Sequence, residues 1–133
     1  MIKSIYKKDC MYGMNCENAL FRKIREKWGE DIKKTARYAI FDYENDNLQI
    51  ELKNRRVNFS TYPSMMMGLN KLKKAEETKD KKKSIFLFNF KDGLYYWEYD
   101  KNQYDLGWGG RNDRGIDERK TTAFIPTKHL IKV

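Results

Sequence analysis

Hydrophobic and polar residues follow two periodicities along the chain, and each periodicity predicts a different kind of element. In residues 15–31 apolar side chains recur every three or four positions, which predicts an amphipathic helix. Residues 36–43 and 48–59 instead have the composition and alternation of two strands. The polar sequence ENDN between them suits a tight turn, so we expect the two strands to pair as an antiparallel hairpin.

A second helix and further strands are predicted in the rest of the chain. The segment TYPSMMMGLNKLKKAEETKDKKK predicts a helix with Pro63 just outside it, Ser64 as its N-cap and Met65 on its apolar side. The runs SIFLFNF and LYYWEYD predict two strands joined by the hairpin KDG, and AFIPTKHLIKV predicts a last strand. A long glycine-rich loop is expected from Leu106 onward. The order αββαββ plus a terminal strand indicates one α/β (α+β) domain over residues 1–133, with a mixed central sheet flanked by helices.

The charges of the predicted hairpin gather on one of its faces. Polar and apolar side chains alternate from residue 48 onward, so Glu51 and Lys53 point to the same side of their strand. A turn at the centre of ENDN pairs Asp42 with Gln49. This register places Asp42 on the same face as Glu51 and Lys53. The opposite face carries apolar side chains, namely Phe41, Tyr43, Leu48, Ile50 and Leu52.

Two carboxylates and a lysine on one face point to a specific chemistry. Diagonal neighbours of an antiparallel pair lie about 7–8 Å apart, so the carboxylates of Asp42 and Glu51 could meet around one cation. Magnesium is commonly held by one or two carboxylates and keeps waters that can act as nucleophiles. Lys53 would orient such a water or offset charge on a phosphate, which makes phosphodiester hydrolysis the natural reaction. The alternative is a solvated sheet face on which Glu51 and Lys53 form an ordinary surface pair.

The composition adds a polyanionic partner to this picture. The chain has 28 Lys and Arg against 19 Asp and Glu, a net charge of +9 and a pI near 9.5. Clustered basic residues neutralise phosphates and release counterions, so nucleic acid is the partner that this charge favours.

Several other classes are excluded by the same sequence. No run approaches a membrane span and the N-terminal segment MIKSIYKKDC lacks the apolar region of a signal peptide, so we expect an intracellular, cytoplasmic protein. Cys10, Cys16 and the single His129 give no recurring zinc spacing. A lone histidine also provides no basis for a Ser-His-Asp or Cys-His pairing.

At this point the residues carry a resemblance to a known family. Asp42 and the tripeptide Glu51-Leu52-Lys53, flanked by strands and followed by a helix, resemble the core of the PD-(D/E)XK nuclease superfamily. The segment IELKNRRVNFSTYPSMMMGLNKLKKA is similar to small members encoded by phages and other viruses. Phe41 stands where many members have the proline before the aspartate. The resemblance implies a restriction-endonuclease-like core in which Asp42 and Glu51 bind Mg²⁺, with Mn²⁺ able to substitute, and Lys53 assists catalysis.

Further residues are candidates for supporting roles. Glu17 matches the acidic residue that many members of the superfamily hold in their first helix; the alternative is a carboxylate favoured there by the helix dipole. Phosphate contacts are expected from basic residues near the hairpin and from the glycine-rich loop, with solvated surface charge as the alternative for the former. These basic residues are Arg55, Arg56, Lys71, Lys74, Arg111 and Arg114.

Three hypotheses follow. The first is a magnesium-dependent DNA endonuclease, encoded by a phage or virus and acting inside the host cell, for which a homodimer that cuts both strands is one arrangement. The second is a non-catalytic basic module that binds nucleic acid. The third is a viral interaction protein whose basic surface binds an acidic host protein. Dependence on a divalent metal separates the first from the other two.

Overall fold

The computed structural model describes residues 9–109 and 120–133, and it divides the chain into two compact units, Met1–Lys33 and Lys34–Val133. The described part of the smaller unit is dominated by the helix α1 (Asp9–Trp28), which is longer than the predicted 15–31 at its start and shorter at its end. The helix stops where Gly29 adopts a φ of 142°, a conformation that favours glycine. No helix in the described residues is long and apolar enough to cross a membrane.

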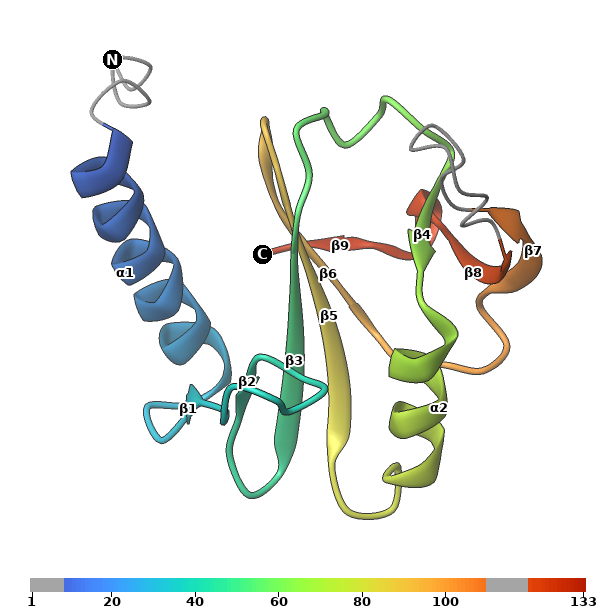
Figure 1. Cartoon of the computed structure of the whole chain (residues 1–133), viewed down its shortest axis with the longest axis horizontal. Coiled ribbons are helices and arrows are strands. Elements are labelled where there is room, and N and C mark those ends of the chain that lie inside the picture. The colour runs from blue at the N-terminus through green and yellow to red at the C-terminus, as the bar shows by residue number, and fades with distance from the viewer. Residues whose placement is uncertain (1–8, 110–119) are drawn as a thin grey trace. The chain divides into compact units, whose positions relative to one another are not determined.

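The larger unit contains a mixed sheet and a smaller antiparallel sheet (Figure 1). In the mixed sheet the strands follow the order β2 (Tyr43–Glu44), β3 (Leu48–Asn54), β5 (Lys83–Phe90), β6 (Gly93–Glu98) and β9 (Ile131–Lys132). The strands β3 and β5 are parallel, and the other pairs among these five are antiparallel. The smaller sheet has the order β4 (Ser64–Met67), β8 (Lys120–Pro126) and β7 (Asp105–Gly109). The short strand β1 (Lys33–Lys34) lies at the boundary between the units, and η2 (Thr127–His129) is a 3-10 turn before β9.

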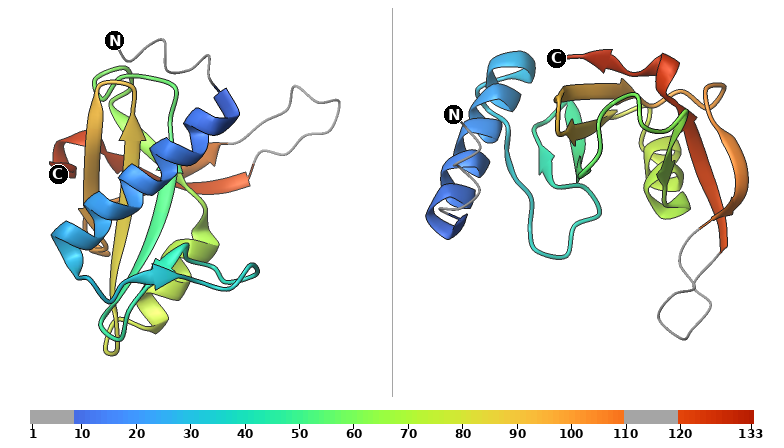
Figure 2. Two further views of the ribbon diagram at one scale, coloured as in Figure 1. Left: turned by 90° about the vertical axis from the view of Figure 1, so that its left-hand side faces the viewer. Right: turned by 90° about the horizontal axis from the view of Figure 1, so that it is seen from above.

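The connection from β3 to its parallel partner β5 contains β4 and the helix α2 (Leu69–Glu77), as a parallel pair requires a long crossover. Figures 1 and 2 show α2 and the smaller sheet on the same side of the mixed sheet. A core of large apolar side chains fills the space between them, with Phe86, Phe88 and Trp97 contributed by the mixed sheet and Leu72 by α2. This core fixes the face of β3 on which the candidate site lies.

The mixed sheet, the antiparallel β2–β3 pair and the KDG hairpin between β5 and β6 were expected, but the strand over residues 36–43 is wrong. Only Tyr43 of that segment belongs to a strand. The rest is a loop, in which the Ala39 amide donates to the Ala36 carbonyl and Tyr38 is 88% exposed. Phe41 leaves the expected leucine face and packs its ring 5.7 Å from that of Phe86 in the core.

The helix expected to begin at Ser64 is also wrong, because residues 64–67 form the strand β4. Met65 and Met67 are buried while Met66 is 43% exposed, which is the period of a strand and not of a helix. The strand pairs along its length with β8, far away in the sequence. The helix α2 begins only at Leu69, with Gly68 as its N-cap.

Other boundaries differ by a few residues. The strand β3 ends at Asn54 and not near Phe59, and the loop expected from Leu106 begins with the strand β7. The expected last strand is divided into β8, the turn η2 and β9. The order αββαββ therefore does not describe the chain, which inserts β4 before the second helix.

Candidate active site

The strands β2 and β3 bring the two predicted carboxylates to the same place by a register that differs from the expected one. Tyr43 lies opposite Ile50 and Glu44 opposite Gln49, two residues from the predicted pairing. Asp42, just before β2, donates its backbone N–H to the Ile50 carbonyl at 2.9 Å. Its carboxylate oxygen Oδ2 accepts the N–H of Leu52 at 2.8 Å, so the Asp42 side chain is held against the backbone next to Glu51.

Glu51 is buried, with a residue exposure of only 4%. In the parallel pairing of β3 with β5, Glu51 is in register with Phe86, so both side chains lie on the face that the core covers. The alternative of a solvated surface pair does not hold for this residue. A buried carboxylate is costly unless it is paired or binds a cation, and such residues mark functional sites more often than exposed ones do.

Two lysines from different elements contact the two oxygens of this carboxylate. The ammonium of Lys53, on the same face of β3, lies 3.4 Å from Glu51 Oε2. The ammonium of Lys71, on α2, lies 3.2 Å from Oε1 and donates to the carbonyl of Ile40 at 2.5 Å. The ammonium of Lys71 is thus a cationic partner of the buried Oε1, which it meets as an ion pair. A metal ion at this oxygen would have to share it with Lys71 or displace that ammonium.

The pKa of Glu51 is raised above its usual range, mainly because burial removes solvent from the carboxylate and secondly because of the negative charge of Asp42. The charges of Lys71 and Lys53 act in the opposite direction but do not cancel the rise. The two carboxylates are thus close enough to repel each other. A cation between them would reduce this repulsion and would stabilise the charged form of the buried Glu51.

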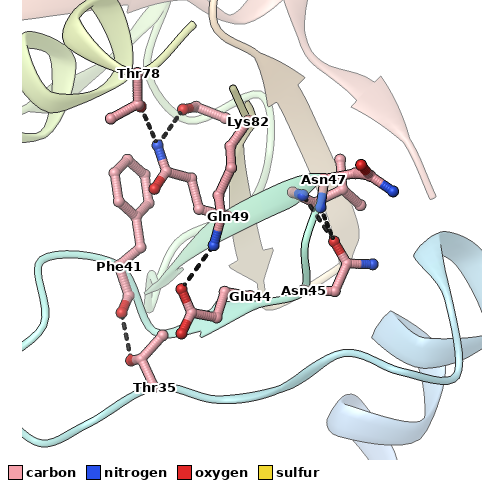
Figure 3. Close-up of polar contacts among 10 residues, drawn as sticks. Thr35, Phe41, Glu44, Asn45, Asn47, Gln49, Thr78 and Lys82 are labelled. Carbon is pink, nitrogen blue, oxygen red and sulfur yellow. Dashed lines mark hydrogen bonds and ion pairs between the residues drawn. The ribbon is translucent and has the colours of Figure 1, made fainter. Parts of the chain in front are cut away.

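Polar contacts around the β2–β3 turn connect this hairpin to neighbouring segments (Figure 3). The amide nitrogen of Gln49 donates to the hydroxyls of Thr78, at the end of α2, and Ser84, on β5, at 2.7 and 2.9 Å. Lys82 forms an ion pair with Glu44 at 2.9 Å. The two Gln49 bonds join β3 to the C-cap of α2 and to β5, the two elements that supply Lys71 and the core beside Glu51.

Replacing Glu51 with Gln is expected to raise the melting temperature by a few degrees at pH 7 in EDTA. Because the pKa of Glu51 is raised on folding, wild-type stability is higher below the unfolded-state pKa and falls as the pH rises through the folded-state pKa. Gln does not titrate, so the advantage of the variant should disappear below the ordinary glutamate pKa of 4.5. Thermal unfolding monitored by circular dichroism measures this, with Glu98→Gln at an exposed ion pair as the matched control. A lower melting temperature for Glu51→Gln at pH 7 would contradict the account.

The other predicted site residues have different positions. Arg55 continues the Glu51 face just beyond β3, where its backbone N–H donates to the Asn89 carbonyl at 2.9 Å, and Arg56 follows it in an exposed position. Lys74 is half-buried on α2 and lines a small cavity beside the loop before β2. The contact of Lys71 with Glu51 was not anticipated from the sequence, which predicted a phosphate contact for this lysine. That phosphate contact stays a prediction.

Three predicted residues are not tested by this geometry. Arg111 and Arg114 lie outside the described residues. Glu17 belongs to α1 in the smaller unit, and its side chain also lies outside the described part of the chain. Their roles stay predictions.

The ligands that the site offers suit one kind of metal better than another. Among the side chains that the structure describes, which do not include those of residues 9–18, no group of three or more His, Cys, Asp or Glu could hold a metal ion together. Two carboxylates, one of them buried, are a set of ligands that Mg²⁺ accepts, since it keeps several of its waters.

Comparison with known proteins agrees with the resemblance in the sequence. One family profile, described as "Phage putative PDDEXK endonuclease", matches residues 7–133. No curated protein and no solved structure matched the chain. Because the family match covers most of the sequence, including both carboxylates and Lys53, the chain belongs to this phage PDDEXK endonuclease family.

Proposed function

We propose that this protein is a magnesium-dependent DNA endonuclease that hydrolyses phosphodiester bonds at Asp42, Glu51 and Lys53. The single observation that carries the proposal is the burial of the Glu51 carboxylate beside the negative charge of Asp42, two causes that together raise its pKa. A structural role alone gives no reason to bury this charge, since an apolar residue would be less costly there.

Asp42 and Glu51 are the residues that would hold the metal. When bound, Mg²⁺ supplies a nucleophilic water and charge stabilisation for the phosphate, and Mn²⁺ would substitute for it. Asp42 is prepared for this role because its Oδ2 is fixed by the Leu52 amide, which orients the carboxylate. Glu51 is suited to the same role because burial and the charge of Asp42 disfavour its ionised carboxylate, and a bound cation would stabilise that ionised form.

The two lysines have separate roles in this proposal. Lys53 is 29% exposed at its side chain, so its ammonium can leave Glu51 Oε2 and offset the charge that develops on the phosphate. Lys71 is less exposed and is also bound to the Ile40 carbonyl, so it is more constrained. We assign Lys71 to neutralising Glu51 before the metal binds and to a nearby phosphate contact afterwards.

A direct test uses purified protein with supercoiled, linear, single-stranded and branched DNA, each with Mg²⁺, Mn²⁺ or EDTA. Nicked or linearised products are expected with either metal and not with EDTA. Calorimetry should detect binding of the metal to the wild-type protein alone. Absence of both cleavage and metal binding would refute the proposal.

The second candidate is a basic module that binds nucleic acid without cutting it. One observation favours it: Lys53 and Lys71 already contact both oxygens of Glu51, so the carboxylate is partly neutralised without a metal. This module would bind DNA equally well in Mg²⁺ and in EDTA and would leave it intact.

Nucleic-acid binding itself, common to both candidates, should depend strongly on salt. The net charge of +9 leads us to expect a loss of affinity of at least about tenfold between about 50 and 200 mM salt, because several phosphate contacts release counterions. Fluorescence anisotropy with a labelled oligonucleotide in EDTA measures this without cleavage. An affinity that hardly changes with salt would remove the argument from charge.

A further inference from the structure

A cavity of about 450 Å³ lies beyond the end of β3, and its walls combine aromatic and basic side chains. Tyr62, Met66 and Phe124 form apolar walls, and Arg55 and Arg56 form a basic one. The volume falls within the range of about 300–1,000 Å³ that is typical of small-ligand pockets. The cavity lies wholly in the larger unit and includes neither Asp42 nor Glu51.

The apolar walls present side chains that a ligand could cover. Tyr62 is 56% exposed and Met66 is 43% exposed, an unusual degree for large apolar side chains that line one cavity. Phe124 is opposite Met66 in the β4–β8 ladder and is held over Gly107, where a Cβ would lie 2.7 Å from the phenylalanine ring. Met66 and Phe124 thus belong to two paired strands, and Tyr62 lies in the bend just before β4.

The basic wall has charge that no carboxylate of the described residues pairs with. The guanidinium of Arg55 donates to the Met66 carbonyl at 3.4 Å, and within the described residues neither Arg55 nor Arg56 forms an ion pair with a carboxylate. Burial lowers the pKa of Arg55, which shows that its charge is partly removed from water. A half-buried guanidinium that has no anionic partner among the described residues, beside an exposed aromatic ring, is complementary to a ligand that has both a phosphate and a flat ring.

We propose that this cavity binds one unstacked base of a single-stranded segment of the nucleic acid, with Tyr62 against the base and Arg55 and Arg56 on the adjoining phosphate. Bases within a duplex are stacked and do not present their ring faces to a pocket. A cavity with apolar walls therefore selects a base that has left the stack. The inference rests on the proposed function, because it names the form of the substrate that the nuclease acts on.

The distance from the cavity to the candidate active site matches the length of a few nucleotides of a single strand. Arg55 follows Glu51 by four residues on the same face of one extended segment, a span of about 13 Å at about 3.3 Å per residue. That span corresponds to about four steps of a stacked strand at 3.4 Å each, and to fewer steps of an extended one. A single strand could therefore reach from the cavity to Asp42 and Glu51 without a break.

The test measures binding in EDTA, so that it does not depend on cleavage. Fluorescence anisotropy compares a labelled oligothymidine of about ten nucleotides with an abasic backbone of equal length and charge. The wild-type protein should bind the oligothymidine about tenfold more tightly, since stacking of one base on an aromatic side chain has an effect of that order. Tyr62→Ala should reduce this ratio to near one, and Tyr62→Phe should preserve it.

Two further variants serve as controls. One tests the contribution of the phosphate contact separately from that of the base, and the other tests the general effect of removing an exposed tyrosine. Arg55→Gln should weaken binding of both oligonucleotides by a similar factor, because both carry the phosphate. Tyr38→Ala, at a tyrosine that is more exposed than Tyr62 and lies outside the cavity, should leave the ratio unchanged. The inference is overturned if wild type does not distinguish the two oligonucleotides, or if the ratio survives Tyr62→Ala. Either result leaves the metal-dependent cleavage assay untouched, so failure of this inference and failure of the proposed function are distinguishable.

Discussion

Replacing Asp42 with Asn or Glu51 with Gln is expected to abolish cleavage of DNA in the presence of Mg²⁺ while the protein stays folded. Each substitution keeps the size of the side chain but removes a negative charge that the proposed function assigns to the metal. The amide of Gln at position 51 would also place a donor or a neutral acceptor where the buried carboxylate now lies. Plasmid nicking measures the activity, and calorimetry measures the affinity for Mg²⁺.

Matched substitutions at exposed carboxylates control for general loss of charge. Asp46→Asn changes an exposed residue of the β2–β3 turn, and Glu98→Gln changes an exposed glutamate of β6 that pairs with Lys83. Both controls should cleave at the wild-type rate. Cleavage by Asp42→Asn or Glu51→Gln at a rate similar to that of these controls would contradict the assignment.

Replacing Lys53 with Ala is expected to slow cleavage by at least about a hundredfold while the protein still binds metal and DNA. The ammonium of Lys53 is 3.4 Å from Glu51 Oε2 but does not supply a ligand, so its removal leaves both carboxylates in place. The loss should fall on the rate of the chemical step if the charge of Lys53 acts mainly in the transition state. Single-turnover cleavage at saturating protein measures that step, and calorimetry shows that Mg²⁺ still binds.

Lys83→Ala is the matched control for this prediction, since Lys83 also pairs with a glutamate on the mixed sheet but is far more exposed. It should cleave at the wild-type rate. A Lys53→Ala variant that retains the wild-type single-turnover rate would show that Lys53 only neutralises Glu51. A variant that no longer binds metal would show that the lysine holds the carboxylates in position.

The elements predicted correctly from the sequence are those whose partners lie nearby in the chain. The hairpin of β5 and β6 could be predicted because a short polar turn separates two apolar runs. The helical interpretation of residues 64–67 failed because the partner of this strand is β8, and the contact between Pro63 and Thr127 at its end joins residues 64 positions apart. Three consecutive methionines are compatible with a helix or with a strand, so the pairing with β8 determines that residues 64–67 form a strand.

The candidate site could be predicted in part for the same reason. Alternation within β3 placed Glu51 and Lys53 together, and the short connection to β2 brought Asp42 near them despite the different register. The burial of Glu51 could not be predicted, because it depends on the parallel partner β5 and on the core above it. The contact of Lys71 with Glu51 depends on how α2 packs, which the periodicity of one helix does not determine.

The parallel pairing of β3 with β5 also determines when the site can form during synthesis of the chain. Gln49 and Ser84, which bond across this pair, are 35 residues apart in the sequence, so the pairing requires closure of a long loop and contributes to a high contact order. A nascent chain that ends before β5 already contains Asp42, Glu51 and Lys53, but it lacks the strand and core that bury Glu51. The native burial of Glu51 therefore requires β5, so a chain that ends before this strand lacks part of the assembled site.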